Sequence, residues 1–199
     1  MELLEQDKNR LLRICIHEAG HYILSKEFGF TTSGISVLIF HKEGHIGAAS
    51  FEPLRPLIKN MQDLILYLEH RIQILYAGVL AESIDINGQY DEVYAKNEWN
   101  NEGGQIDHAK IRELVHTLRN IKYPHTTDSE NGQQEITQID NTLVESSGNL
   151  VTKKIKIIFQ IGELLKEKVT HYGMEYTLSE FELIQLESLR EYYNEEYQN

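Results

Sequence analysis

The feature that most constrains this chain is the motif His-Glu-x-x-His, which occupies positions 17–21. On an α-helix, residues four apart lie on one face, so His17 and His21 can direct both imidazoles at a single metal ion. Glu18 lies about 100° further round the helix. It can reach a water molecule on that metal without being a ligand itself. This is the ligand layout of a zinc peptidase, with two neutral histidines, a carboxylate base and an open coordination position.

The sequence around the motif predicts a buried helix over residues 8–28, with Gly29 as its stop signal. Apolar side chains recur there at helical spacing, namely Leu11, Ile14, Cys15, Leu24 and Phe28. Histidine and glutamate cost free energy inside such a helix unless they are paired or metal-bound. Gly20 costs about 1 kcal/mol relative to alanine, and its bare backbone on the histidine face would let another element come close to the metal. The alternative is a structural helical protein with a chance motif.

Composition narrows the class of protein. A chain of 199 residues, 41% hydrophobic and 25% charged, is typical of one soluble domain with at most a small helical appendage. The net charge of −12 argues against a nucleic-acid surface and against anionic membranes. A charged start without an apolar core region, no run of 18 apolar residues and a single cysteine favour a cytoplasmic protein without a membrane span. Cys15 is expected to be a small buried apolar residue.

The remaining pattern predicts a mainly α fold with a small β-hairpin or sheet. We expect a strand at 34–40, a turn at 41–44 and a weaker strand at 45–51 that ends at Pro53 and Pro56. His41 and His45 flank the turn, but they are not on a helix, so a second metal site is not expected there. We expect helices at 61–83 and 105–119, joined by a polar loop over 87–104 that is suited to a lid or a surface excursion.

The C-terminal third is expected to be helical as well. Helical pattern resumes at about residue 135, is interrupted at 146–149, and continues as a strong amphipathic helix. Ser179 and Glu182 form a capping box that opens a last helix. The domain prediction is a metallopeptidase core at 1–119, a linker at 120–134 and a C-terminal helical part at 135–199 that packs on the same domain.

Two carboxylates lie where apolar residues would be expected. Glu82 continues the buried stripe of the helix at 61–83, where it either ends the apolar face near solvent or hydrogen bonds to a histidine ligand. Asp107 begins the apolar face of the helix at 105–119, where it is either a helix cap or an inward-pointing third ligand for zinc. The residues alone leave both alternatives open.

Three blocks of sequence resemble the peptidase domain of the FtsH family of ATP-dependent membrane proteases. Positions 17–21 read His-Glu-Ala-Gly-His, as in that family. Positions 77–82 (Ala-Gly-Val-Leu-Ala-Glu) and 103–109 (Gly-Gly-Gln-Ile-Asp-His-Ala) are similar to two of its helix segments. The order of the blocks, the hairpin between them and Thr177–Glu180 after a long helix also agree.

The resemblance implies an FtsH-peptidase-like helical metalloprotease domain without the ATPase or transmembrane parts of that family. It implies that His17, His21 and Asp107 bind zinc, that Glu18 is the catalytic base, and that Glu82 is a supporting or alternative ligand. Tyr22 departs from the alanine that is usual there.

The functional hypothesis is therefore a zinc metalloendopeptidase that cleaves flexible or unfolded polypeptide, with substrate added as a strand along the hairpin edge. Delivery by a separate ATPase or adaptor and oligomerisation stay open. The alternative is a metal-binding regulatory or protein-interaction module of the same fold that does not turn over peptide.

Overall fold

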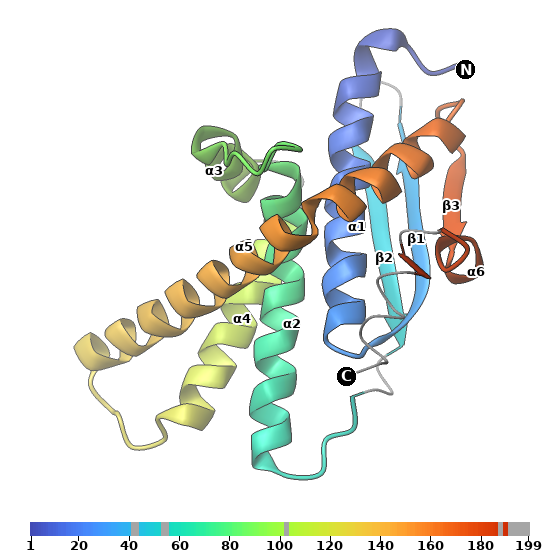
Figure 1. Ribbon diagram of the computed structural model, residues 1–199. Coiled ribbons are helices and arrows are strands. Elements are labelled where there is room, and N and C mark those ends of the chain that lie inside the picture. Colours follow the sequence, from blue (N-terminus) through green and yellow to red (C-terminus); the bar gives the residue numbers. More distant parts are fainter. Residues whose placement is uncertain (41–43, 53–55, 102–103, 187–188, 191–199) are drawn as a thin grey trace.

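The computed structural model describes residues 1–199 except 41–43, 53–55, 102–103, 187–188 and 191–199. The turn expected at 41–44 therefore lies mostly outside the described residues, as do Pro53 and Gly103. The fold is mainly helical with a three-stranded antiparallel sheet, as the sequence predicted in coarse outline. Figure 1 shows the sheet on one side of helix α1 (Lys8–Glu27), helices α2 (Met61–Glu82) and α4 (Gln105–Lys122) on its opposite side, and α5 (Ser129–Lys168) crossing α1 toward β3 (Glu175–Ser179).

Helix α1 is the centre of the molecule, and it covers the predicted range almost residue for residue. Every residue from Ile14 to Ser25 is buried, because strands cover one side of α1 and helices α2 (Met61–Glu82) and α5 (Ser129–Lys168) cover the other. A helix that is buried all round lies in the core. The polar motif of α1 therefore has little access to bulk water except where a cleft reaches it.

The sheet has the strand order β2–β1–β3, so β2 is an edge strand. The predicted hairpin is confirmed as β1 (Thr31–Ile39) paired with β2 (His45–Glu52). The third strand, β3 (Glu175–Ser179), was not predicted, because only Leu178 is buried in it and no alternating pattern results. Ser179 caps the short helix α6 (Glu180–Leu183) through the predicted capping box with Glu182.

Helix α2 confirms the predicted helix at 61–83 and starts at the side chain of Asn60, which accepts a hydrogen bond from the Asp63 amide. By length and composition alone α2 could also cross a membrane, with a mean hydropathy of 1.3 in its most apolar window. However, 61% of that window is buried inside the fold, and core helices pass the same test. The burial explains the apolar character of α2 without a membrane.

Two helical segments extend further than predicted. The loop expected at 87–104 is wrong, since it contains helix α3 (Glu92–Asn101), which begins where the Asp91 carboxylate accepts a hydrogen bond from the Tyr94 amide. The linker expected at 120–134 shrinks to 123–128, because α4 (Gln105–Lys122) runs one turn longer and Asp128 caps the start of α5.

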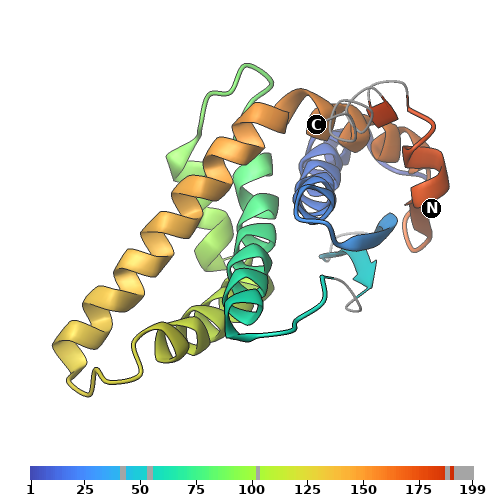
Figure 2. The same ribbon diagram turned by 60° about the horizontal axis from the view of Figure 1, so that its bottom comes forward.

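The interruption expected at 146–149 is also wrong, since α5 is continuous over 40 residues. The Ser147 hydroxyl is satisfied inside the helix by the Leu143 carbonyl at 2.6 Å. One glycine at position 148 costs only about 1 kcal/mol, which burial of the apolar stripe on both sides offsets. Figure 2 shows the first half of α5 running beside α4, away from the sheet.

Candidate metal centre

The motif face of α1 lies directly against α2. A Cβ atom on Gly20 would be 2.5 Å from the Ala77 carbonyl oxygen, so the two helix backbones touch at this point. The glycine does let another element come close, but that element is α2. Gly104, at the start of α4, does not pack against Gly20. It faces the Val79 side chain and the Glu98 carbonyl.

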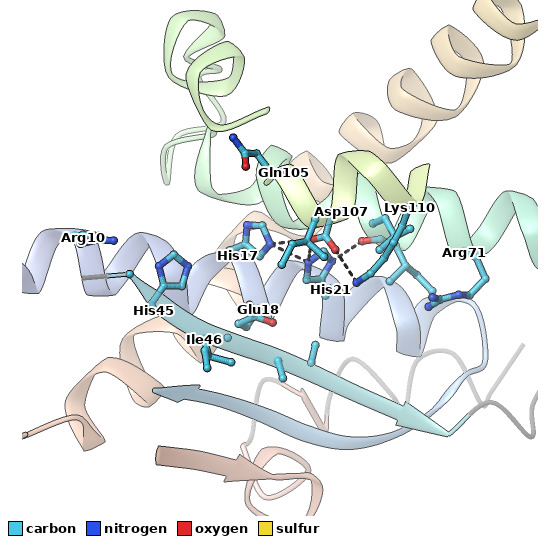
Figure 3. A pocket seen from close by; sticks show the side chains of 17 residues that line it. Arg10, His17, Glu18, His21, His45, Ile46, Arg71, Gln105, Asp107 and Lys110 are labelled. Carbon is cyan, nitrogen blue, oxygen red and sulfur yellow. Dashed lines mark hydrogen bonds and ion pairs between the residues drawn. The ribbon is translucent and has the colours of Figure 1, made fainter. Parts of the chain in front are cut away.

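His17, His21 and Asp107 converge and form a group that could hold a metal ion, with their ligand atoms all within 4.8 Å of one another. The two Nε2 atoms are 2.9 Å apart, and the Asp107 Oδ2 atom is 3.0 Å from His21 Nε2 and 3.3 Å from His17 Nε2. All three residues are at most 9% exposed. Figure 3 shows the carboxylate descending from α4 onto the two imidazoles of α1.

The other ring nitrogens fix how the histidines are oriented. Nδ1 of His17 donates to Glu82 Oε1 at 2.9 Å, and Nδ1 of His21 donates to the Ile74 carbonyl at 2.7 Å. With both Nδ1 atoms donating, each neutral ring presents the lone pair of Nε2 to the centre. Two lone pairs and a carboxylate oxygen at these distances repel one another unless a proton or a cation lies between them.

The pKa shifts of His17 and Asp107 both favour a positive charge between these groups. Burial disfavours the imidazolium, but the charge of Glu82 and the hydrogen bonds to Asp107 and Glu82 outweigh it and raise the pKa of His17 well above its ordinary value. Burial likewise opposes ionisation of Asp107, yet hydrogen bonds from both histidines hold its pKa well below the usual range. Both shifts favour a proton in the metal-free site, and a metal ion that binds there would compete with it.

Glycine at position 78 leaves the space between the rings open. A Cβ atom at this position would be 2.5 Å from His17 Nε2 and 2.6 Å from His21 Nε2. A side chain would thus occupy the cradle that the two imidazoles form. The donor set, its spacing and this cradle could hold a metal ion, and nitrogen and carboxylate ligands are ones that transition metals take.

Glu82 is not part of the converging group. It accepts the hydrogen bond from Nδ1 of His17, on the side of the ring that faces away from the group. Its second oxygen accepts a hydrogen bond from the Tyr94 hydroxyl on α3 at 3.2 Å. The Arg13 guanidinium lies 3.9 Å from the centre of the Tyr94 ring and donates to the Glu82 carbonyl at 3.4 Å. Of the two alternatives for Glu82, the geometry matches a hydrogen bond to a histidine of the site.

Glu18 lies beside the group but points along the cleft toward β2 (Figure 3). A Cβ atom on Gly47 would collide with the Glu18 carboxylate, so β2 passes close to the acid with bare backbone. Burial raises the pKa of Glu18, and the charges of His17 and His21 act in the opposite direction. A buried carboxylate with a raised pKa is a better proton acceptor near neutral pH.

A cleft of about 660 Å³ opens onto these groups. It is bounded by α1, α2, α4, Gly44 and residues 45–49 of β2, and both Glu18 and Asp107 line it. Within the described part of the chain, no strand pairs with the outer edge of β2. The cleft therefore brings the candidate metal group, a carboxylate and an unpaired strand edge together.

The sequence named the three residues of the converging group but missed several residues that surround it. Gly78 lies in the block at 77–82, where its packing against the rings gives no sequence signal. Tyr94 fell in the segment expected to be a loop, and Arg71 and Lys110 of the cleft were not singled out. His45 lines the cleft, and among the described residues the only group suited to a metal is that of His17, His21 and Asp107.

Comparisons with known proteins add no identification. No protein-family model matches the chain, and neither does any curated protein. The functional argument therefore rests on the chemistry of the site and on the resemblance of the three sequence blocks.

Proposed function

We propose that the protein is a zinc-dependent endopeptidase that hydrolyses peptide bonds in flexible or unfolded polypeptide, with the peptidase-domain fold of the FtsH family. The observation that carries this proposal is the His17–His21–Asp107 group opening, with buried Glu18, onto a cleft beside an unpaired strand edge. A metal site that only stabilised the fold would have no need of such a cleft, because structural zinc sites are closed.

His17, His21 and Asp107 would hold the zinc ion. When bound, zinc supplies Lewis acidity that polarises a carbonyl and lowers the pKa of a water molecule. Glu18 would accept a proton from the attacking water and pass it to the leaving amine. Glu82 and the Ile74 carbonyl keep both imidazoles oriented through their Nδ1 atoms.

The edge of β2 would hold the substrate. A polypeptide laid along it forms backbone hydrogen bonds in register, which select for extended chain rather than for a particular sequence. His45 and Ile46 line the cleft at the start of β2, and Gly47, Ala48 and Ala49 follow them with small side chains or none. Because folded proteins do not offer extended segments, substrates are flexible or unfolded unless a separate ATPase or adaptor delivers them.

Two measurements on wild type and Glu18→Gln test this function. Elemental analysis is expected to find about one zinc per chain in both proteins, since Glu18 is not a ligand. Cleavage of a fluorescently labelled unfolded polypeptide is expected from wild type only, because the substitution keeps the shape and removes the base.

The other outcomes are equally informative. Cleavage by Glu18→Gln at the wild-type rate would show that Glu18 is not the base. Zinc without any cleavage by the wild type would favour the metal-binding regulatory or protein-interaction module. Folded protein without metal from a zinc-replete preparation would leave only a chance motif.

A further inference from the structure

The charges in the cleft differ from those of the molecule as a whole. The chain has a net charge of −12, yet the cleft is lined by Arg10, Arg71 and Lys110. Among the described residues that line it, the carboxylates are Glu18 and Asp107, which the proposed mechanism uses. Because ions screen charges over about 8 Å at physiological salt, a bound segment senses these local cations more than the acidic surface beyond.

The cations are not spread evenly along the cleft. In Figure 3, Arg71 on α2 and Lys110 on α4 lie on one side of the His–Asp group, and Arg10 lies toward the opposite end with His45. Arg71 is half-buried in the wall, where burial lowers the pKa of its guanidinium, and the charge of Asp107 acts in the opposite direction. The ammonium of Lys110 lies 3.4 Å from Asp107 Oδ1. Both cations therefore lie at the end of the cleft next to Asp107.

The pair between Lys110 and Asp107 does not account for this arrangement. The Lys110 side chain is 52% exposed, and exposed ion pairs contribute little to stability. If Asp107 ligates a divalent ion, its charge is offset by that ion. Lys110 and Arg71 then lie beside a positive centre and attract an anion more strongly than in the metal-free protein.

We infer that Arg71 and Lys110 form a subsite for a carboxylate of the bound polypeptide, which makes the enzyme selective for segments with an acidic group near the scissile bond. This inference rests on the proposed function. A segment laid along β2 with its scissile carbonyl at the His–Asp group carries its neighbouring residues to these two cations. The arginine fork and the lysine ammonium suit a carboxylate from an aspartate or glutamate side chain, or from a chain terminus.

Peptide binding to zinc-loaded Glu18→Gln tests the inference without turnover. The probes are fluorescent peptides of one length that carry either glutamate or glutamine at each position in turn, and one peptide with its C-terminus as free acid or as amide. The acid is expected to bind about tenfold more tightly than its amide counterpart at the favoured position, as charge-assisted hydrogen bonds predict. The peptide pair that shows the difference identifies which source of the carboxylate is recognised.

Arg10→Gln is the matched control, because it removes the same charge from another part of the same cleft. Arg71→Gln or Lys110→Gln, each added to Glu18→Gln, is expected to reduce the preference for acid to within about threefold, and Arg10→Gln is expected to retain it. Arg71→Lys is expected to fall between, because it keeps the charge and loses the fork. Lys110→Glu changes an exposed residue, so it is expected to fold and to reverse the preference.

Equal binding of acid and amide peptides by Glu18→Gln would overturn the inference. So would an equal loss in Arg10→Gln, since that result would indicate the charge of the whole cleft rather than a subsite. Failure of the proposed function is distinguishable from both results. A wild-type protein that cleaves nothing, with an acid preference retained in Glu18→Gln, keeps the subsite as part of a binding module. Cleavage without any preference keeps the peptidase and removes the subsite.

Discussion

At the scale of single residues, the main choice is between Asp107 and Glu82 as the third metal ligand. Both were predicted from their place on a core-facing stripe, but helical periodicity cannot tell which carboxylate reaches the imidazole Nε2 atoms. The geometry separates them, because Asp107 Oδ2 faces both Nε2 atoms and Glu82 Oε1 faces only Nδ1 of His17. The sequence could name the candidates because their spacing is local, whereas the contact joins elements about 90 positions apart in the chain.

The first prediction follows from this geometry. Asp107→Ala removes a ligand and is expected to abolish tight zinc binding, whereas Glu82→Ala is expected to weaken zinc affinity by about 10–100-fold, as losing a hydrogen bond to a ligand histidine does. Competition with a chromophoric chelator measures both affinities. If Glu82→Ala loses the metal while Asp107→Ala keeps it, the roles of the two carboxylates are reversed.

The raised pKa of His17 predicts how metal binding depends on pH. In the metal-free protein the neighbouring carboxylates favour the imidazolium, so a metal ion must displace a proton. Zinc affinity is therefore expected to fall as the pH falls through the pKa of His17, because His17 is then protonated before zinc is added. Calorimetry in buffers of different ionisation enthalpy is expected to show proton release on binding. A heat that does not depend on the buffer would contradict the assignment of His17 as a ligand.

At the scale of secondary-structure elements, Gly78 shows why a helix must lack a side chain at one position. Gly78→Ala is expected to abolish zinc binding and keep α2 folded, because the new methyl group would lie 2.5 Å and 2.6 Å from the two Nε2 atoms. Gly148→Ala is the matched control, since a Cβ atom there meets nothing within 4 Å. The control is expected to bind zinc normally and to gain up to about 1 kcal/mol in unfolding free energy. Zinc titration and denaturant unfolding of both variants provide the measurements, and normal zinc binding by Gly78→Ala would contradict the proposed position of the ion.

The elements also show where sequence patterns are informative. The bounds of helices α1 and α2 were predicted nearly to the residue. Each has a continuous buried face, so its apolar residues recur at helical spacing, which a short stretch of sequence is enough to show. Helix α3 was missed because Ala95 is the only buried residue among Glu92–Glu98, so tertiary contact rather than amphipathic pattern holds it. The first half of α5 was placed too late because its cap, Asp128, follows a polar stretch that reads as a linker.

In the molecule as a whole, the candidate metal site joins helix α1, which is packed on several sides, to helix α4, which has fewer contacts with the rest of the fold. Helix α1 is enclosed by the sheet, α2 and α5, whereas α3 contacts mainly α2 and α4. An ion bound by His17, His21 and Asp107 would tie α4 to α1. A ligand that binds only the folded state stabilises it in proportion to the logarithm of its concentration over the dissociation constant. The ion is therefore expected to stabilise α3 and α4 most, because these helices make fewer other contacts than α1, α2 and α5.

Hydrogen exchange tests this expectation. Removal of zinc by a chelator is expected to speed amide exchange in α3 and the first half of α4, because Asp107 is then linked to α1 by its hydrogen bonds to the two histidines and no longer by the ion. Exchange in α1 and β1 is expected to stay slow, since their burial does not depend on the ion. Gly78→Ala is expected to reproduce the pattern without chelator, which separates loss of the ion from side effects of chelation. Uniform acceleration across α1, β1 and α5 would instead mean that the whole fold depends on the metal, and an unchanged profile would mean that no ion joins α1 to α4.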